Sequence, residues 1–154
     1  MKLSINGLKL IAEFEGLRLS PYYATDLEKQ KGIVTIGYGS TFYPDGAKVQ
    51  IKDLPITKER ALELLKVTAD TFALKVNALV DKPLTQNQFD ALVSLAYNIG
   101  LGNFAKSTVL RLVNVNPIDQ NIGHWFMAWN KQSGKVLNGL TKRRQKEIDL
   151  YFSK

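Results

Sequence analysis

The hydrophobic pattern of the chain changes once, near residue 56, and this change limits the folds that the sequence can adopt. From about residue 57 apolar residues recur at helical spacing in successive segments, over 57–80, 85–99, 107–114, 118–130 and 141–152. The residues before this point hold one short helical pattern followed by strand-like and turn sequence. We therefore expect an α+β, mostly helical protein in which a small sheet accompanies a larger helical body.

No repeat, low-complexity tract or Gly/Ser-rich linker divides the sequence. A chain of 154 residues is long enough for one compact domain. We expect a single domain over 1–154, with a small β lobe over about 13–56. The helical lobe is expected over about 57–154 together with the N-terminal helix.

The composition excludes several kinds of site. The chain has no cysteine and one histidine, so disulfides, thiol nucleophiles and histidine-rich metal sites are excluded, and no metal or cofactor is expected.

The net charge of +7 favours binding to polyanions, which include nucleic acid, anionic lipid and acidic envelope polymers. No apolar run approaches the ~20 residues of a membrane-spanning helix, and the N-terminus lacks a signal-peptide core, so no membrane insertion or export signal is expected.

The first helical pattern carries an acidic residue on its apolar face. Four residues share that face at helical spacing: Leu8, Ile11, Ala12 and Glu15. Gly16 follows as a typical stop signal. A carboxylate there meets both desolvation and the negative end of the helix dipole, and both favour its protonated form. Glu15 is therefore a candidate general acid, and a side chain that turns out to water is the competing interpretation.

Strand-like sequence follows. The stretches GIVTIGYGSTFY at 32–43 and AKVQI at 47–51 flank the turn signal PDG, which predicts a small hairpin or three-stranded sheet. Alternation places Thr35, Gly37 and Gly39 on one strand face. Glycines there either mark bends or leave room for a ligand such as a sugar chain, and Thr35 itself is also a common strand residue. Packing and carbohydrate contact are both open for four nearby tyrosines: Tyr22, Tyr23, Tyr38 and Tyr43.

Two features of the helical part bear on packing and charge. Trp125 and Trp129 are four residues apart and are expected in the core. The basic stretch GLTKRRQKE at 139–147 is typical of a solvated helix face. Nucleic-acid binding by this stretch is not supported, because no recognised DNA- or RNA-reading motif accompanies it.

Four stretches together resemble one family: FEGLRLSPYY, VTIGYGS, FDALVSLAYNIGLGNFAKSTVLR and GLTKRRQKEIDLY. In this order, over nearly the whole chain, they resemble the phage-type lysozymes, or endolysins, of glycoside hydrolase family 24. The resemblance implies a two-lobed lysozyme-like fold with a cleft between the lobes. It also implies hydrolysis of the β-1,4 bond between N-acetylmuramic acid and N-acetylglucosamine in bacterial peptidoglycan. We expect a monomer that waits in the host cytoplasm until lysis and has no nucleic-acid partner.

The family's catalytic set is a glutamate, an aspartate or cysteine nine positions later, and a threonine on the next strand. Glu15 and Thr35 match, but the middle position is Ala24. Three explanations are open. An extended loop supplies Asp26, or else Glu28, in its place; or Ala24 replaces an acidic residue or cysteine and the chain binds but cleaves poorly; or Glu15 acts alone, as in lytic transglycosylases. We favour Asp26, which is two residues away in a loop long enough to bend.

The resemblance also assigns substrate contacts. It also implies a cation that holds the catalytic glutamate. Arg143, the first of the paired arginines, is the candidate that reaches back toward this glutamate, and Arg144 is the second candidate. Asn98 in YNIG matches a cleft position that contacts sugar. The candidate substrate-binding set is Tyr23, Gly37, Gly39, Asn98 and Arg143. Two rival functions remain: a catalytically silent peptidoglycan binder, and a basic helical nucleic-acid binder.

Overall fold

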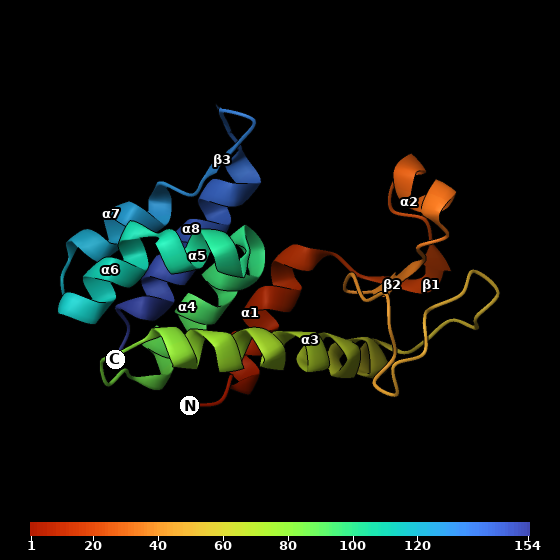
Figure 1. Cartoon of the computed structure of the whole chain (residues 1–154), viewed down its shortest axis with the longest axis horizontal. Helices are drawn as coiled ribbons and strands as arrows, with labels where there is room; N and C mark the ends of the chain where they lie inside the picture. The colour runs from red at the N-terminus through yellow and green to blue at the C-terminus, as the bar shows by residue number, and fades with distance from the viewer. The chain divides into compact units, whose positions relative to one another are not determined.

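The computed structural model describes all 154 residues, and the chain divides into two compact units (Figure 1). One unit comprises residues 9–69, and the other comprises residues 1–8 and 70–154. Helices α1 and α3 contribute to both. In chain order the elements are α1 (Ile5–Glu15), β1 (Arg18–Tyr22), α2 (Asp26–Lys31), β2 (Thr35–Gly37), α3 (Lys58–Leu79), α4 (Gln86–Ile99), α5 (Leu101–Lys106), α6 (Thr108–Val115), α7 (Asn121–Met127), β3 (Lys131–Gln132), β4 (Lys135–Val136) and α8 (Asn138–Tyr151).

The expected class, α+β and mostly helical, is confirmed. The patterns over 57–80 and 85–99 form α3 and α4 within two residues of the expected bounds. Thr85 caps α4 in a capping box, in which its side chain accepts from the Gln88 N–H and the Gln88 side chain accepts from the Thr85 N–H. Gly100 follows α4 as its C-cap, and Gly102 lies inside the short helix α5.

In the unit of residues 9–69, β1 pairs antiparallel with β2, with a bulge in the register. Its core cluster combines β2, the loops around it and the first turns of α3: Val34, Ile36, Val49 and Leu64, with Tyr23, Tyr43 and Ile56 packed against them. The hairpin expected around PDG is reduced to a single bridge between Phe42 and Lys48, so that prediction was only partly right. The positive φ of Gly37 (69°) and Gly39 (101°) ends the strand, so the expected alternation does not continue through Gly39.

The polar segment after β1, expected to be an extended loop, is the helix α2. Thr25 caps it by accepting a hydrogen bond from the Glu28 N–H (3.0 Å). Acidic residues occupy its first turn and lysines its last, which matches the helix dipole at both ends. Gly32 then ends the helix in the left-handed conformation, with φ at 69°. Caps and charge therefore form this helix without any apolar stripe.

In the other unit, five helices form a closed circuit of neighbours, since α4 packs on α5, α5 on α6, α6 on α7, α7 on α8, and α8 on α4. The interior is apolar, and Phe89, Leu92, Phe104 and Phe126 are at most 1% exposed. Ser4 caps the start of α1 in this unit, and its backbone N–H donates to the buried Asp90 of α4 (3.1 Å).

Two features of this unit were not predicted from the sequence. The loop after α7 contains a two-stranded ribbon, β3 and β4, that projects beyond the helices (Figure 1). Its turn residues Ser133 and Gly134 both have positive φ (52° and 78°). Trp125 and Trp129 were expected in the core, but Trp125 is 39% exposed and Trp129 is only half-buried. Because α7 ends at Met127, the two rings do not share one helical face.

Candidate functional site

Glu15 is the last residue of α1. The apolar stripe expected beneath it is confirmed, since Leu8, Ile11 and Ala12 are buried. Glu15 itself is half-buried, and Glu13 on the opposite face is exposed. The helix has no basic residue in its last turn, so α1 offers no side-chain cation at its negative end. Gly16 stops the helix in the left-handed conformation, with φ at 69°.

Thr35 begins β2 and lies opposite Tyr22 of β1. It is 5% exposed, and its strand neighbours Ile36 and Gly37 are also buried. A threonine hydroxyl held on a buried strand has few rotamers and a fixed direction. Thr35 belongs to the same compact unit as Glu15.

The segment between them carries the other acidic candidates. Ala24 is exposed and precedes the cap of α2. Asp26 is the first residue of that helix and is exposed, so its carboxylate also serves the helix N-terminus. Glu28 is half-buried, and its Oε2 is buried without a hydrogen-bond partner. The carboxylate of α2 with an unsatisfied buried oxygen is therefore that of Glu28, which sequence reasoning ranked below Asp26.

Three other predicted substrate contacts lie in this unit. Tyr23 packs on the core cluster, and the ammonium of Lys29 lies 5.8 Å from its ring centroid. A Cβ on Gly37 would lie 3.2 Å from the Cβ of Ala61, so this glycine permits close packing of β2 on α3. Gly39 has open space where a Cβ would point. The structure thus gives packing roles to Tyr23 and Gly37, whereas Gly39 has free space beside it.

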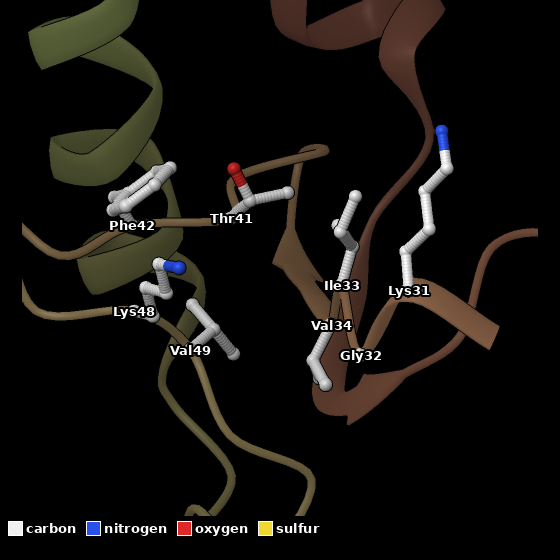
Figure 2. Close-up of a pocket in the computed structure, with 8 residues that line it drawn as sticks. All are labelled: Lys31, Gly32, Ile33, Val34, Thr41, Phe42, Lys48 and Val49. Atoms are coloured by element: carbon white, nitrogen blue, oxygen red, sulfur yellow. The ribbon is translucent and has the colours of Figure 1, made fainter. Parts of the chain in front are cut away.

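A cavity of about 260 Å³ lies beside this sheet. Figure 2 shows its two walls, one from the chain that leads into β2 and one from the loop that follows. Its lining residues are Lys31, Gly32, Ile33, Val34, Thr41, Phe42, Lys48 and Val49. No carboxylate lines it, so this cavity cannot supply the acid or the base of a hydrolytic reaction.

The paired arginines in the other unit were expected on a solvated helix face, and this was wrong. Arg143 is 3% exposed, while Arg144 and Glu147 are fully buried. The Glu147 carboxylate lies 3.0 Å from the Nε of Arg144 and accepts from the Nε of Arg143 (3.3 Å) and from the Ser94 hydroxyl (2.5 Å). Burial raises the pKa of Glu147 against the lowering effect of both arginines, and burial lowers the pKa of Arg144 to about 10.

Sequence reasoning missed Glu147, although its spacing was informative. Positions 143, 144 and 147 are related by i,i+3 and i,i+4, so one acidic and two basic side chains share a face of α8. An acidic residue at that spacing neutralises part of the basic stretch. The stretch can therefore face the interior of the helical unit instead of water.

Asn98 lies near the end of α4 and is exposed, and its Oδ1 accepts a hydrogen bond from the Nη2 of Arg144. It borders a groove of about 340 Å³ in the same unit. The groove is lined by Asn98, Ile99, Asn103, Trp129, Lys131, Gln132 and Leu140. An aromatic ring among amides and a lysine can contact a polar ligand with apolar faces. The predicted link between Arg143 and Glu15 stays a prediction.

Two further kinds of feature would bear on function, a membrane-spanning helix and a metal-binding cluster. No helix of the chain combines the length and the apolar character that crossing a bilayer requires. Groups of three or more side chains able to ligate a metal are also absent.

Comparison with known proteins gives a consistent result. A model of the phage lysozyme family matches residues 12–147. The endolysin of Bacillus phage B103 is 42% identical over 153 residues, which are 99% of this chain and 55% of that protein. The endolysin of Salmonella phage P22 is 40% identical, with 99% of both chains covered. This chain therefore spans about half the length of the Bacillus phage relatives, and nearly all of the Salmonella phage protein.

Solved structures agree with this result. A P22 lysozyme mutant superposes with a TM-score of 0.85 at 39% identity, and the match covers 99% of each chain. The muramidase domain of SpmX from Asticaccaulis excentricus superposes with a TM-score of 0.80, also at 39% identity and over 99% of each chain. By sequence over almost its whole length and by fold, the chain belongs to the phage lysozyme family.

Proposed function

We propose that the protein hydrolyses the β-1,4 bond between N-acetylmuramic acid and N-acetylglucosamine in bacterial peptidoglycan, with Glu15 as the general acid. Family membership supports the reaction class. The observation that carries the role of Glu15 is its position, half-buried at the C-terminal end of α1 above a buried apolar stripe. A carboxyl group fixed at a helix end and partly shielded from water can be placed within hydrogen-bond reach of a glycosidic oxygen, as an acid catalyst must be.

In the proposed step, the carboxyl proton of Glu15 passes to the glycosidic oxygen as the bond from that oxygen to the anomeric carbon breaks. A water molecule forms the new bond to this carbon and loses a proton to a base on the other side of the sugar ring. The Thr35 hydroxyl, fixed on β2, would orient this water. An inverting arrangement of this kind needs roughly 6.5 to 9.5 Å between the two carboxyl groups.

The identity of the second carboxylate is the open element of this mechanism. Asp26 is our first candidate, because it is exposed and lies close to position 24 in the chain. Glu28 is the second, and its buried Oε2 without a hydrogen-bond partner supports a role for that group. The exposed Ala24 supports a different outcome, in which the protein binds peptidoglycan and cleaves it poorly. A lytic transglycosylase with Glu15 alone is the remaining alternative.

The test is clearing of a peptidoglycan suspension by Glu15→Gln, with Glu13→Gln as the matched control from the exposed face of the same helix. We expect Glu15→Gln to abolish clearing and to leave thermal unfolding nearly unchanged. Glu13→Gln should clear at the parental rate. Clearing retained by Glu15→Gln would remove this residue from the catalytic role.

Four wider expectations belong to the same proposal. We propose that the chain acts as one lysozyme-like domain and as a monomer, that it does not depend on nucleic acid, and that it is held in the host cytoplasm until lysis gives it access to the wall. Sedimentation velocity would test the monomer. Cell fractionation before and after lysis would test the localisation.

A further inference from the structure

Asn98 combines an exposed position with a buried partner. Its side chain borders the groove of the helical unit, yet its Oδ1 accepts a hydrogen bond from Arg144, which is fully buried. A surface amide normally rotates between two orientations that exchange its oxygen and nitrogen. Here the buried partner selects one of them.

Arg144 is itself held in place. Its Nε lies 3.0 Å from the Oε1 of Glu147, which is also fully buried. The other carboxylate oxygen of Glu147 accepts from Arg143 (3.3 Å) and from Ser94 (2.5 Å). Arg143 in turn donates to the backbone carbonyl of Ser94 (3.2 Å). The ion pair with Glu147 and complete burial restrict the guanidinium next to Asn98, although its Nε and Nη1 have no hydrogen-bond partner.

The chemistry of arginine then fixes the direction of the amide. A guanidinium has only donors, so the Asn98 atom that meets it must be the carbonyl oxygen. The Nδ2 group, with its two N–H donors, points away from Arg144. Asn98 therefore offers donors, and not an acceptor, at the edge of the groove.

The rest of the groove suits an acceptor-rich ligand. Lys131 adds a cation, and no aspartate or glutamate lines the groove. Ile99, Trp129 and Leu140 supply apolar surface on which the less polar face of a ligand can pack. A ligand that carries carbonyl or carboxylate oxygens beside apolar groups, such as the acetamido or carboxylate groups of a wall polymer, matches this combination.

We infer that Arg144 is a positioning residue that, with Glu147, holds the Asn98 amide so that its Nδ2 donates to an acceptor oxygen of the bound polymer. The inference rests on the proposed muramidase function and adds the direction of one substrate hydrogen bond. In this proposal Arg144 acts on the polymer through Asn98 and does not itself contact it.

Asn98→Asp separates this role from a structural one. An aspartate keeps an oxygen for Arg144, now with a charge that strengthens that contact, but it removes both N–H donors. We expect the half-saturating concentration of purified peptidoglycan to rise by about 10-fold or more, with a smaller change in the maximal rate and an unfolding midpoint equal to or above that of the parent. A parental half-saturating concentration would overturn the inference, because it would show that Asn98 serves only to hold Arg144.

A cycle of variants tests the positioning by Arg144. Arg144→Met should raise the half-saturating concentration in the parental background, and should have no further effect on it in an Asn98→Ala background. Equal effects in both backgrounds would contradict action through Asn98. If Arg144→Met does not fold, Arg144→Lys takes its place in the same cycle, because lysine keeps a buried cation but lacks the planar group that donates to Asn98.

Asn121→Asp is the control for added negative charge, because Asn121 is an exposed residue of the same unit outside the groove. It should leave the half-saturating concentration within about 2-fold of the parent, since a single exposed charge is largely screened. The same assay distinguishes the two levels of the proposal. Failure of the parental protein to release fragments refutes the muramidase function, whereas parental activity with an unaffected Asn98→Asp variant refutes only the inference about the amide.

Discussion

Gly7→Ala should destabilise the protein even though alanine is the better helix former. Gly7 lies in the first turn of α1, where a Cβ would lie 2.6 Å from the Leu3 Cδ1 and 2.7 Å from the Asp90 Cγ. Leu3 could rotate, but Asp90 cannot move cheaply. It is fully buried and accepts hydrogen bonds from Ser4 (backbone N–H, 3.1 Å, and hydroxyl) and from the Gln86 side chain (2.8 Å).

The change in the free energy of unfolding combines one stabilising and two destabilising contributions. Alanine in place of glycine in a helix gains about 0.5–1 kcal/mol. An added methyl group in a filled interior costs about 1–3 kcal/mol. Displacing the Asp90 carboxylate from its donors costs about 1–3 kcal/mol more, because a buried charged group loses partners. The expected net loss is about 1–5.5 kcal/mol, which lowers the melting temperature by about 2–22 °C for a chain of this size.

Urea unfolding followed by tryptophan fluorescence measures this loss. The midpoint should fall while the slope of the free energy against urea stays constant. Gly102→Ala in α5 is the matched control, because open space surrounds the position of its Cβ, and it should stabilise by about 0.5–1 kcal/mol. A Gly7→Ala variant as stable as the parent would refute the reasoning, since it would mean that Asp90 can retreat without losing its hydrogen bonds.

Three further predictions concern the unit of residues 9–69. Asp26→Asn should slow wall clearing by about 10²- to 10⁴-fold if Asp26 is the second carboxylate, and a parental rate in the turbidity assay would exclude it. Gly37→Ala should lower the free energy of unfolding by about 1–3 kcal/mol in a urea titration, because φ is 69° there and the new Cβ would lie 3.2 Å from the Cβ of Ala61. The Gln50 N–H and then the Tyr43 hydroxyl lower the pKa of Asp53, so its stabilising contribution is complete above the ordinary pKa of about 3.9 and is lost as the pH falls through the lowered folded-state value. Tyr43→Phe should raise the folded-state pKa of Asp53 in an NMR titration. The pH interval between the folded-state and the ordinary pKa, over which the stabilisation is lost, should then be narrower. An unchanged pKa would contradict the role of the Tyr43 hydroxyl.

Helices with an apolar stripe could be predicted from the sequence. The stripe of α1, the length of α3 and the capping box of α4 all follow from spacing and local hydrogen-bond chemistry. These signals depend on neighbours in the chain, so no knowledge of tertiary contacts was needed. Glu15 could be identified as a candidate for the same reason, because its position on the stripe is a local property.

Features that depend on distant contacts or on charge alone could not be predicted in this way. Helix α2 has six residues and no buried one, so no periodicity reveals it, and its caps and charge order are the only signals. Arg143 and Arg144 suggest a solvated face until Ser94 and Glu147 are known to surround them. The pairing of β1 with β2 was missed because the turn signal PDG favoured a closer partner for β2.

Analysis of the fragments released from purified peptidoglycan tests the central claim most directly. In the proposed mechanism, Glu15 protonates the glycosidic oxygen and water attacks the anomeric carbon. This mechanism predicts fragments that end in reducing N-acetylmuramic acid. Fragments ending in the 1,6-anhydro sugar would contradict hydrolysis and indicate a transglycosylase. The absence of any fragment, with the protein sedimenting with the wall, would contradict an enzymatic function altogether.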